Sequence, residues 1–113
     1  MDAFTRNYLA AALWAETDDD DQPWDDNYEP EDFGVEDVKE AEKETKEFRR
    51  MAGKAIHADE GRAAADFWLT RQHHGAGFWD GDWGREGNRL TKIAQKFPER
   101  YIYMGADEAL HFG

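Results

Sequence analysis

The chain of 113 residues contains no cysteine, no serine and only three prolines. Without cysteine it forms no disulfide, holds no zinc through thiolates and has no thiol nucleophile, and without serine it lacks the nucleophile of serine hydrolases. It also lacks an apolar run of about 18 residues and a basic, apolar leader, so we expect neither membrane insertion nor export. These absences predict a cytoplasmic protein.

Basic residues are scarce as well. The 14 Lys and Arg stand against 26 Asp and Glu, which gives a formal charge of −12. Such a charge repels phosphate backbones and anionic lipids, so we expect no direct nucleic-acid or membrane binding and favour basic partners. The Trp, Tyr and Phe residues number 5, 4 and 7, more than a disordered acidic chain carries, and they predict one folded domain over residues 1–113.

The negative charge is concentrated in one segment. Residues 1–34 carry −10, whereas residues 35–62 and 63–113 carry −1 each. Ten acids and no base fall within residues 16–32, which we call the acidic tract. Because like charges repel and Pro23 and Pro30 exclude a continuous helix, we predict that residues 16–34 form an extended or loosely held acidic loop.

Three segments have helical patterns. Residues 3–15 are rich in alanine, follow Asp2 as a plausible N-cap, and place Trp14 on the broad apolar face. Residues 35–57 have apolar side chains spaced by three and four, with acids in the first turn and bases late. A third helix is predicted from residue 85 or 86 to Phe97, where Pro98 stops it.

Two segments have patterns typical of hairpins. Aromatic runs at residues 67–71 and 78–79 flank a glycine-containing connection, and residues 101–104 and 110–112 flank a turn. The sequence therefore predicts an α+β fold, with about three helices packed on a short antiparallel sheet of two hairpins. Residues 62–69 have a second interpretation as a helical turn, because three alanines precede the aromatic residues.

The aromatic segment also carries a family resemblance. Asp66-Phe67-Trp68-Leu69-Thr70-Arg71, followed by His74-Gly75-Ala76-Gly77-Phe78-Trp79-Asp80, resembles a family of small acidic bacteriophage proteins without an assigned activity. Residues 8–14, 89–91 and 101–105 look like other landmarks of that family. The resemblance implies a protein that acts on a host or defence protein in the cytoplasm of the host cell, and anti-restriction and anti-CRISPR roles are both compatible with it.

The acidic tract is the main candidate site. Its carboxylates would occupy a basic groove as a DNA mimic does, with aromatic anchors within it. The predicted partner-binding residues are Asp18, Asp19, Asp20, Asp21, Trp24, Asp25, Asp26, Tyr28, Glu29, Glu31 and Asp32. A solvated loop that maintains solubility is one alternative. A cation site is another, but the calcium-loop register that starts at Asp18 has Pro23 where the sharp turn requires glycine.

A second candidate is a small metal-dependent enzyme that uses His73, His74, Asp80 and Asp82. Adjacent histidines on an extended chain point to opposite faces, so a structural turn or a partner-contacting loop explains these residues as well. We predict no catalytic residue, metal or cofactor. A third hypothesis is a phage assembly or structural protein, a monomer or a homodimer, whose exposed aromatic rings form the contact.

Overall fold

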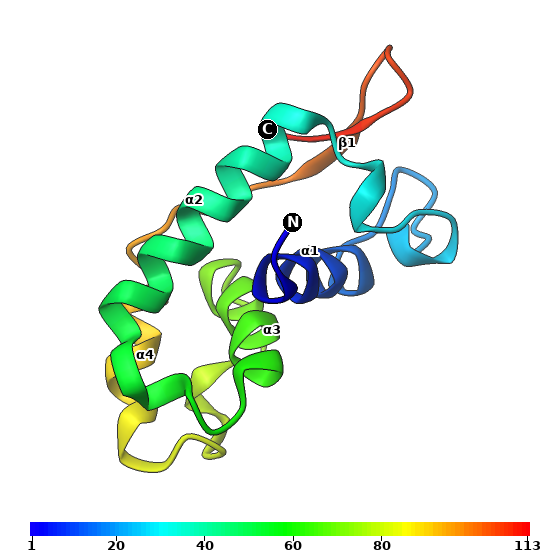
Figure 1. Cartoon of the computed structure of the whole chain (residues 1–113). Helices are drawn as coiled ribbons and strands as arrows, with labels where there is room; N and C mark the ends of the chain where they lie inside the picture. Colours follow the sequence, from blue (N-terminus) through cyan, green and yellow to red (C-terminus); the bar gives the residue numbers. More distant parts are fainter.

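Four α-helices and one two-stranded sheet make up the computed structural model, which describes all of residues 1–113 (Figure 1). The helices are α1 (Ala3–Ala15), α2 (Val35–Ala52), α3 (Glu60–Arg71) and α4 (Gly87–Ala94), and the strands are β1 (Ile102–Met104) and β2 (Leu110–Phe112). Short 3-10 helices occupy the connections: η1 (Trp24–Asp26), η2 (Pro30–Asp32), η3 (Gly53–Ile56), η4 (Phe78–Asp80) and η5 (Gly84–Glu86). The predicted α+β class is confirmed, with four helices instead of three and one hairpin instead of two.

Helices α1 and α3 pack against each other at the centre of the molecule. The Asp2 carboxylate accepts the Thr5 N–H at 2.7 Å, so the predicted N-cap of α1 is confirmed. From the middle of α1, the buried Tyr8 ring stacks on Phe67 of α3 at 5.0 Å and meets the edge of Trp68 at 5.5 Å. These rings supply much of the apolar area that stabilises the fold.

The long helix α2 lies along one side of the molecule (Figure 1). Its buried Phe48 stacks on Phe67 at 4.3 Å and on Phe78 at 5.6 Å, as the apolar stripe predicts. The helix ends at Ala52, earlier than the predicted residue 57. Gly53 has a φ of +61°, which glycine adopts readily, and the chain continues as the 3-10 helix η3.

The hairpin predicted over residues 66–79 is wrong, because residues 60–71 form helix α3. Its first turn is capped by Asp59, whose carboxylate accepts the Arg62 N–H at 3.0 Å. His73 ends it in a left-handed conformation with a φ of +58°. Phe78 begins a 3-10 turn instead of a strand, and its N–H donates to the Thr70 hydroxyl at 3.1 Å. The alternative helical interpretation of residues 62–69 was therefore the correct one.

The C-terminal part of the chain follows the prediction more closely. Helix α4 lies within the predicted segment but ends at Ala94, and residues 102–112 form the expected antiparallel hairpin, with Tyr103 opposite His111. Phe33 forms a parallel bridge with Leu110, and the Gly34 N–H donates to the Leu110 carbonyl at 2.9 Å. The hairpin thus lies beside the end of the acidic tract.

None of the four helices combines the length and the apolar character needed to cross a membrane.

Candidate functional site

The first half of the acidic tract folds into a tight loop. One oxygen of the Asp18 carboxylate accepts the N–H groups of Asp20 and Gln22, at 2.8 and 3.0 Å, and the Asp18 N–H donates to the Gln22 carbonyl at 2.8 Å. Thr17 and Pro23 close the loop as an antiparallel bridge. An aspartate that bonds its neighbouring backbone in this way stabilises a turn, so this part of the loop is not extended, which was one of the two expectations.

The second half of the tract is fixed to the core. Trp24 is only 8% exposed and packs against Tyr28 at a centroid distance of 5.7 Å. The Asp32 carboxylate accepts the Glu29 N–H at 2.8 Å and caps the 3-10 helix η2, and Phe33 beyond it stacks on Phe112 at 4.7 Å. Since its ring lies in the core of this chain, Trp24 anchors the tract to its own fold and presents little surface to a partner.

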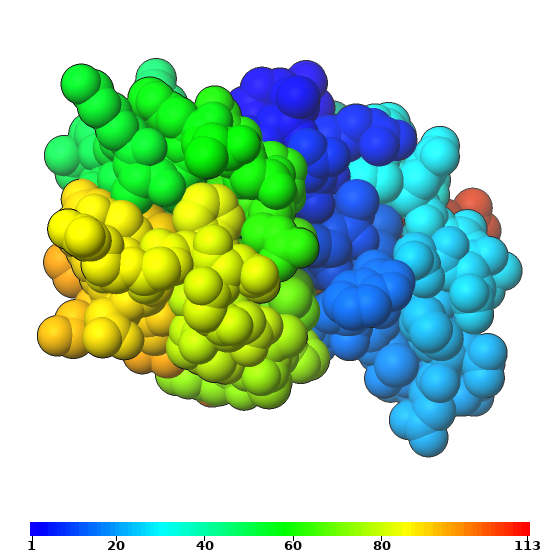
Figure 2. All heavy atoms as spheres, turned by 90° about the horizontal axis from the view of Figure 1, so that it is seen from below, coloured from blue at the N-terminus to red at the C-terminus, as the bar shows by residue number.

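Most carboxylates of the tract face solvent without a basic neighbour. Eight of its acids are exposed: Asp19, Asp20, Asp21, Asp25, Asp26, Glu29, Glu31 and Asp32. Among these eight, only Glu31 forms an ion pair with a base of the chain, Arg6 at 3.0 Å, and its hydrogen bond to Arg6 lowers the Glu31 pKa. Because the tract carries ten of the 26 acids and no base, it holds −10 of the −12 charges. Figure 2 shows this segment, in blue to cyan, as a lobe that projects at one end of the molecule.

Glu16 differs from the other acids of the tract because its side chain turns inward. Its carboxylate accepts the Trp68 indole N–H at 2.8 Å and lies 2.7 Å from the His74 ring nitrogen Nε2. These contacts fix the start of the tract against α3 and the loop that follows it. Sequence reasoning did not find this pairing, because 58 residues separate Glu16 from His74.

The structure does not bring the proposed metal-binding residues together. His74 contacts Glu16, Asp82 forms an ion pair with Arg62 at 2.6 Å, and the Asp80 carboxylate accepts the Gly77 N–H at 3.1 Å. Nowhere in the chain do three His, Asp or Glu side chains converge as metal ligands would, and the calcium-loop register from Asp18 forms no such group either.

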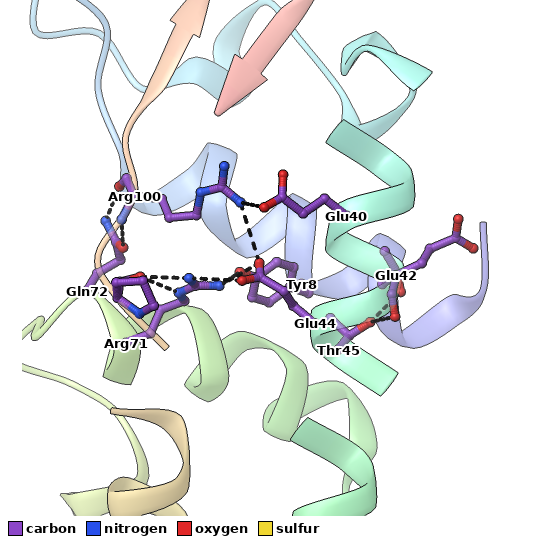
Figure 3. A network of polar contacts seen from close by, with 10 residues as sticks. Tyr8, Glu40, Glu42, Glu44, Thr45, Arg71, Gln72 and Arg100 are labelled. Atoms are coloured by element: carbon purple, nitrogen blue, oxygen red, sulfur yellow. Dashed lines mark hydrogen bonds and ion pairs between the residues drawn. The ribbon is translucent and has the colours of Figure 1, made fainter. Parts of the chain in front are cut away.

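A buried polar network around Arg71 also escaped prediction (Figure 3). The Arg71 guanidinium is completely buried, and it donates to the Tyr8 hydroxyl at 2.8 Å, to a Glu44 oxygen at 2.9 Å and to the Pro98 carbonyl. Burial lowers the Arg71 pKa, but its partners Tyr8 and Glu44 outweigh that effect and raise it, while burial raises the Tyr8 pKa strongly. No surface hollow reaches this guanidinium, so the network joins elements of the fold and does not form a ligand site.

Several aromatic side chains are exposed, among them Trp14, which the sequence placed on the apolar face of the first helix. Trp14, at the end of α1, is 64% exposed, and Tyr101 and Tyr103 on β1 are 66% and 43% exposed. Phe67, Trp68 and Phe78, in contrast, are fully buried. Exposed rings next to a charged lobe are typical contact residues in protein interfaces.

No protein-family model, curated protein or solved structure matches this chain.

Proposed function

We propose that this chain is a non-enzymatic, acidic binding protein that covers the nucleic-acid-binding surface of another protein, as a DNA mimic does. One observation supports the proposal most strongly. Seven exposed carboxylates, all those of the tract except Glu31, have no Lys or Arg partner in their own chain, yet hydrogen bonds and core side chains hold the segment that bears them. A surface that binds DNA phosphates would meet a comparable set of fixed negative charges here.

The order of the tract favours this function over a loop that only maintains solubility. A solvated loop needs charge but no defined conformation, whereas a binding surface benefits from ordering before the partner arrives, because less conformational entropy is then lost on association. Asp18, Trp24 and Asp32 each hold one part of the tract in place. The concentrated charge also attracts a basic partner over distance and speeds association at low salt.

We further propose, from the resemblance to small acidic phage proteins, that the target is a host or defence protein in the cytoplasm of the infected cell. An anti-restriction or anti-CRISPR role fits a protein that prevents its target from engaging nucleic acid. Both roles require the same physical event, which is competition between the carboxylates of the tract and phosphates for one set of Lys and Arg side chains.

The proposal is tested by competition with DNA. Bacterial DNA-binding proteins are loaded on DNA-cellulose, and the purified chain is added at low salt. We expect it to elute a discrete protein, and we expect a variant with Asp19, Asp20, Asp25 and Asp26 changed to Lys to elute none, while its helical circular dichroism stays that of the wild type. Elution by the wild type should weaken steeply as salt increases.

A matched control separates the tract from total charge. Changing Glu36, Glu60, Glu99 and Glu108 to Lys reverses four exposed acids outside the tract, and both variants have a formal charge of −4 instead of −12. The control variant should still elute the target. If the tract variant elutes it equally well, or if free polyaspartate does so at the same charge concentration, the proposal is wrong.

A further inference from the structure

A groove separates the acidic tract from the hairpin. It encloses about 320 Å³, and its walls come from residues 18–20 of the tract, residues 24, 27 and 28 around η1, and residues 102–104 of β1. Three aspartates line one side, and Tyr28, Tyr103 and Met104 add aromatic and thioether surface. Its volume is at the lower end of the range of small-ligand pockets, which suits one side chain better than a large ligand.

The groove has an excess of negative charge that the chain itself leaves unpaired. Asp18 uses one carboxylate oxygen for the backbone of its own turn, and the Asp19 and Asp20 carboxylates form no ion pair or hydrogen bond within the chain. A cation that enters the groove would therefore meet up to three carboxylates without displacing a Lys or Arg of this chain. Carboxylates beside aromatic rings bind planar guanidinium groups well, because ring faces attract the cation and paired oxygens accept its N–H groups.

A second observation points to a bound segment of protein. Trp24 forms part of the groove wall, and its indole Nε1–H is the one buried side-chain polar atom of the chain that has no hydrogen-bond partner. Leaving a buried donor unpaired is costly, and native proteins rarely do so. Because this atom lies beneath the groove surface, a main-chain carbonyl next to an inserted side chain would supply the missing acceptor only by displacing part of the groove wall.

The Tyr103 ring is already fixed in place beside the groove. It lies 5.5 Å from the His111 ring, and His111 is held between Asp37 at 2.6 Å and Asp107 at 2.9 Å. The Tyr101 ring lies 6.0 Å from the Tyr103 ring. A ring positioned in this way can stack on a guanidinium without first losing rotational freedom.

We infer that this groove receives a single arginine side chain from the basic partner, held by residues 18–20 and stacked on Tyr103. The inference rests on the proposed function, since the arginine belongs to the basic surface that faces the tract. It adds specificity, because a uniform field of carboxylates would not distinguish arginine from lysine, whereas a site with both rings and carboxylates does.

The test uses the full chain and short peptides at low ionic strength. Three acetylated, amidated tripeptides, Gly-Arg-Gly, Gly-Lys-Gly and Gly-citrulline-Gly, are titrated while the five indole N–H signals are followed by NMR. The Trp24 signal is identified by its loss in Trp24→Phe. We expect the arginine peptide to shift it saturably and to bind several-fold more tightly than the lysine peptide, and citrulline, which lacks the charge, to leave it unchanged. The Trp83 signal should stay constant, because its N–H donates to Asp66, outside the groove.

Three variants, each made with uncharged side chains, locate the contact. Tyr103→Leu keeps every carboxylate. It should weaken the binding of the arginine peptide by roughly three- to thirtyfold, the range of a partly desolvated cation–π contact. Asp19→Asn with Asp20→Asn should abolish the shift, whereas Asp25→Asn with Asp26→Asn, outside the groove, should retain it. Equal binding of the arginine and lysine peptides, a shift produced by calcium chloride but not by the arginine peptide, or a shift that appears on raising the concentration of the chain alone would each overturn the inference.

The inference and the proposed function fail in different experiments. If no peptide shifts Trp24 and Tyr103→Leu still elutes the target from DNA-cellulose as the wild type does, the groove inference is wrong and the proposed function stands. If the variant with four aspartates of the tract changed to Lys elutes the target from DNA-cellulose as the wild type does, the proposed function is wrong whatever the peptides do.

Discussion

At the scale of single residues, the buried Arg71 contributes to the fold through a set of contacts that no local pattern shows. Its guanidinium joins Tyr8 of α1, Glu44 of α2 and the carbonyl of Pro98, and Arg100 adds an ion pair to Glu40 at 2.8 Å (Figure 3). A charge inside a protein is tolerated when partners satisfy its hydrogen bonds, as they do here. Arg71 therefore stabilises the position of three helices relative to one another.

Replacing Arg71 by methionine should destabilise the protein strongly. The substitution leaves the Glu44 carboxylate and the Tyr8 hydroxyl without their shared donor, and breaking such a buried pair costs about 3–5 kcal/mol. Urea unfolding followed by tryptophan fluorescence measures the loss. Arg50→Ala, which removes an exposed pair with Glu47 on α2, is the matched control and should barely move the midpoint. A small effect at Arg71 would mean that the network adds little stability.

His111 should make stability depend on pH. Hydrogen bonds to Asp107 and then to Asp37 raise the His111 pKa above 6.5. Because the folded pKa exceeds the unfolded value, this contribution is fully present below pH 6.5 and is lost as pH rises through the folded pKa. The urea midpoint should therefore fall as pH rises above about 6.5, less so in His111→Gln. His57→Gln, at an exposed position without an ion pair, should show the same dependence of the urea midpoint on pH as the wild type.

At the scale of elements, the sequence predicts those whose patterns are local and one-sided. Residues 3–15 and 35–52 show an apolar stripe and suitable ends, and the hairpin at residues 102–112 shows two short runs around a turn. Helix α3 lacks such a pattern, because residues 66–71 are buried on all sides and their aromatic and branched members suit strands. Asp59 as a cap and the three alanines at residues 63–65 were the signals that favour a helix.

The sequence also predicts only part of the candidate site. The charge of the tract and its position in the chain follow from composition alone, but its ordered conformation depends on distant partners such as Trp68, His74 and Leu110. Trp24 illustrates the difference. Its type and place suggest an anchor, yet only the fold shows that it anchors the tract internally.

The close contact between α3 and the following loop should not tolerate a methyl group at Gly77. A Cβ at Gly77 would lie 2.5 Å from the Thr70 hydroxyl oxygen, and Thr70 is fully buried. We expect Gly77→Ala to cost about 1–3 kcal/mol of unfolding free energy, the range for overpacking. Gly75→Ala, in the same loop with open space around it, should change stability by less than about 0.5 kcal/mol. Equal effects of the two variants would contradict the close contact.

The turn that Asp18 forms should determine how well the tract binds. Asp18→Ala and Asp19→Ala each remove one negative charge, but only Asp18→Ala removes the two hydrogen bonds to the backbone of Asp20 and Gln22. We expect faster amide hydrogen exchange at these two residues in Asp18→Ala alone, together with a larger loss of target elution from DNA-cellulose. If both variants lose elution equally, charge and not conformation governs binding.

At the scale of the whole molecule, the charge is segregated. The acidic tract carries −10, and the remaining residues, with 16 acids and 14 bases, carry −2. In that remainder, ion pairs such as Arg49 with Asp2 and Arg62 with Asp82 bring opposite charges together, whereas in the tract only Glu31 pairs with a Lys or Arg side chain. The molecule therefore has one strongly negative end and a nearly neutral body, and a basic partner is oriented toward that end as it approaches.

This segregation predicts a difference between two variants of equal net charge. The variant with Asp19, Asp20, Asp25 and Asp26 changed to Lys and the variant with Glu36, Glu60, Glu99 and Glu108 changed to Lys both have a formal charge of −4. On an anion exchanger, the tract variant should elute at clearly lower salt than the control variant. Retention depends on how many carboxylates contact the matrix at once, and only the tract variant interrupts the cluster of carboxylates with lysines. Native mass spectrometry confirms that both are monomeric or equally associated during the comparison. Elution of the two at the same salt concentration would show that the carboxylates of the tract do not act as one surface.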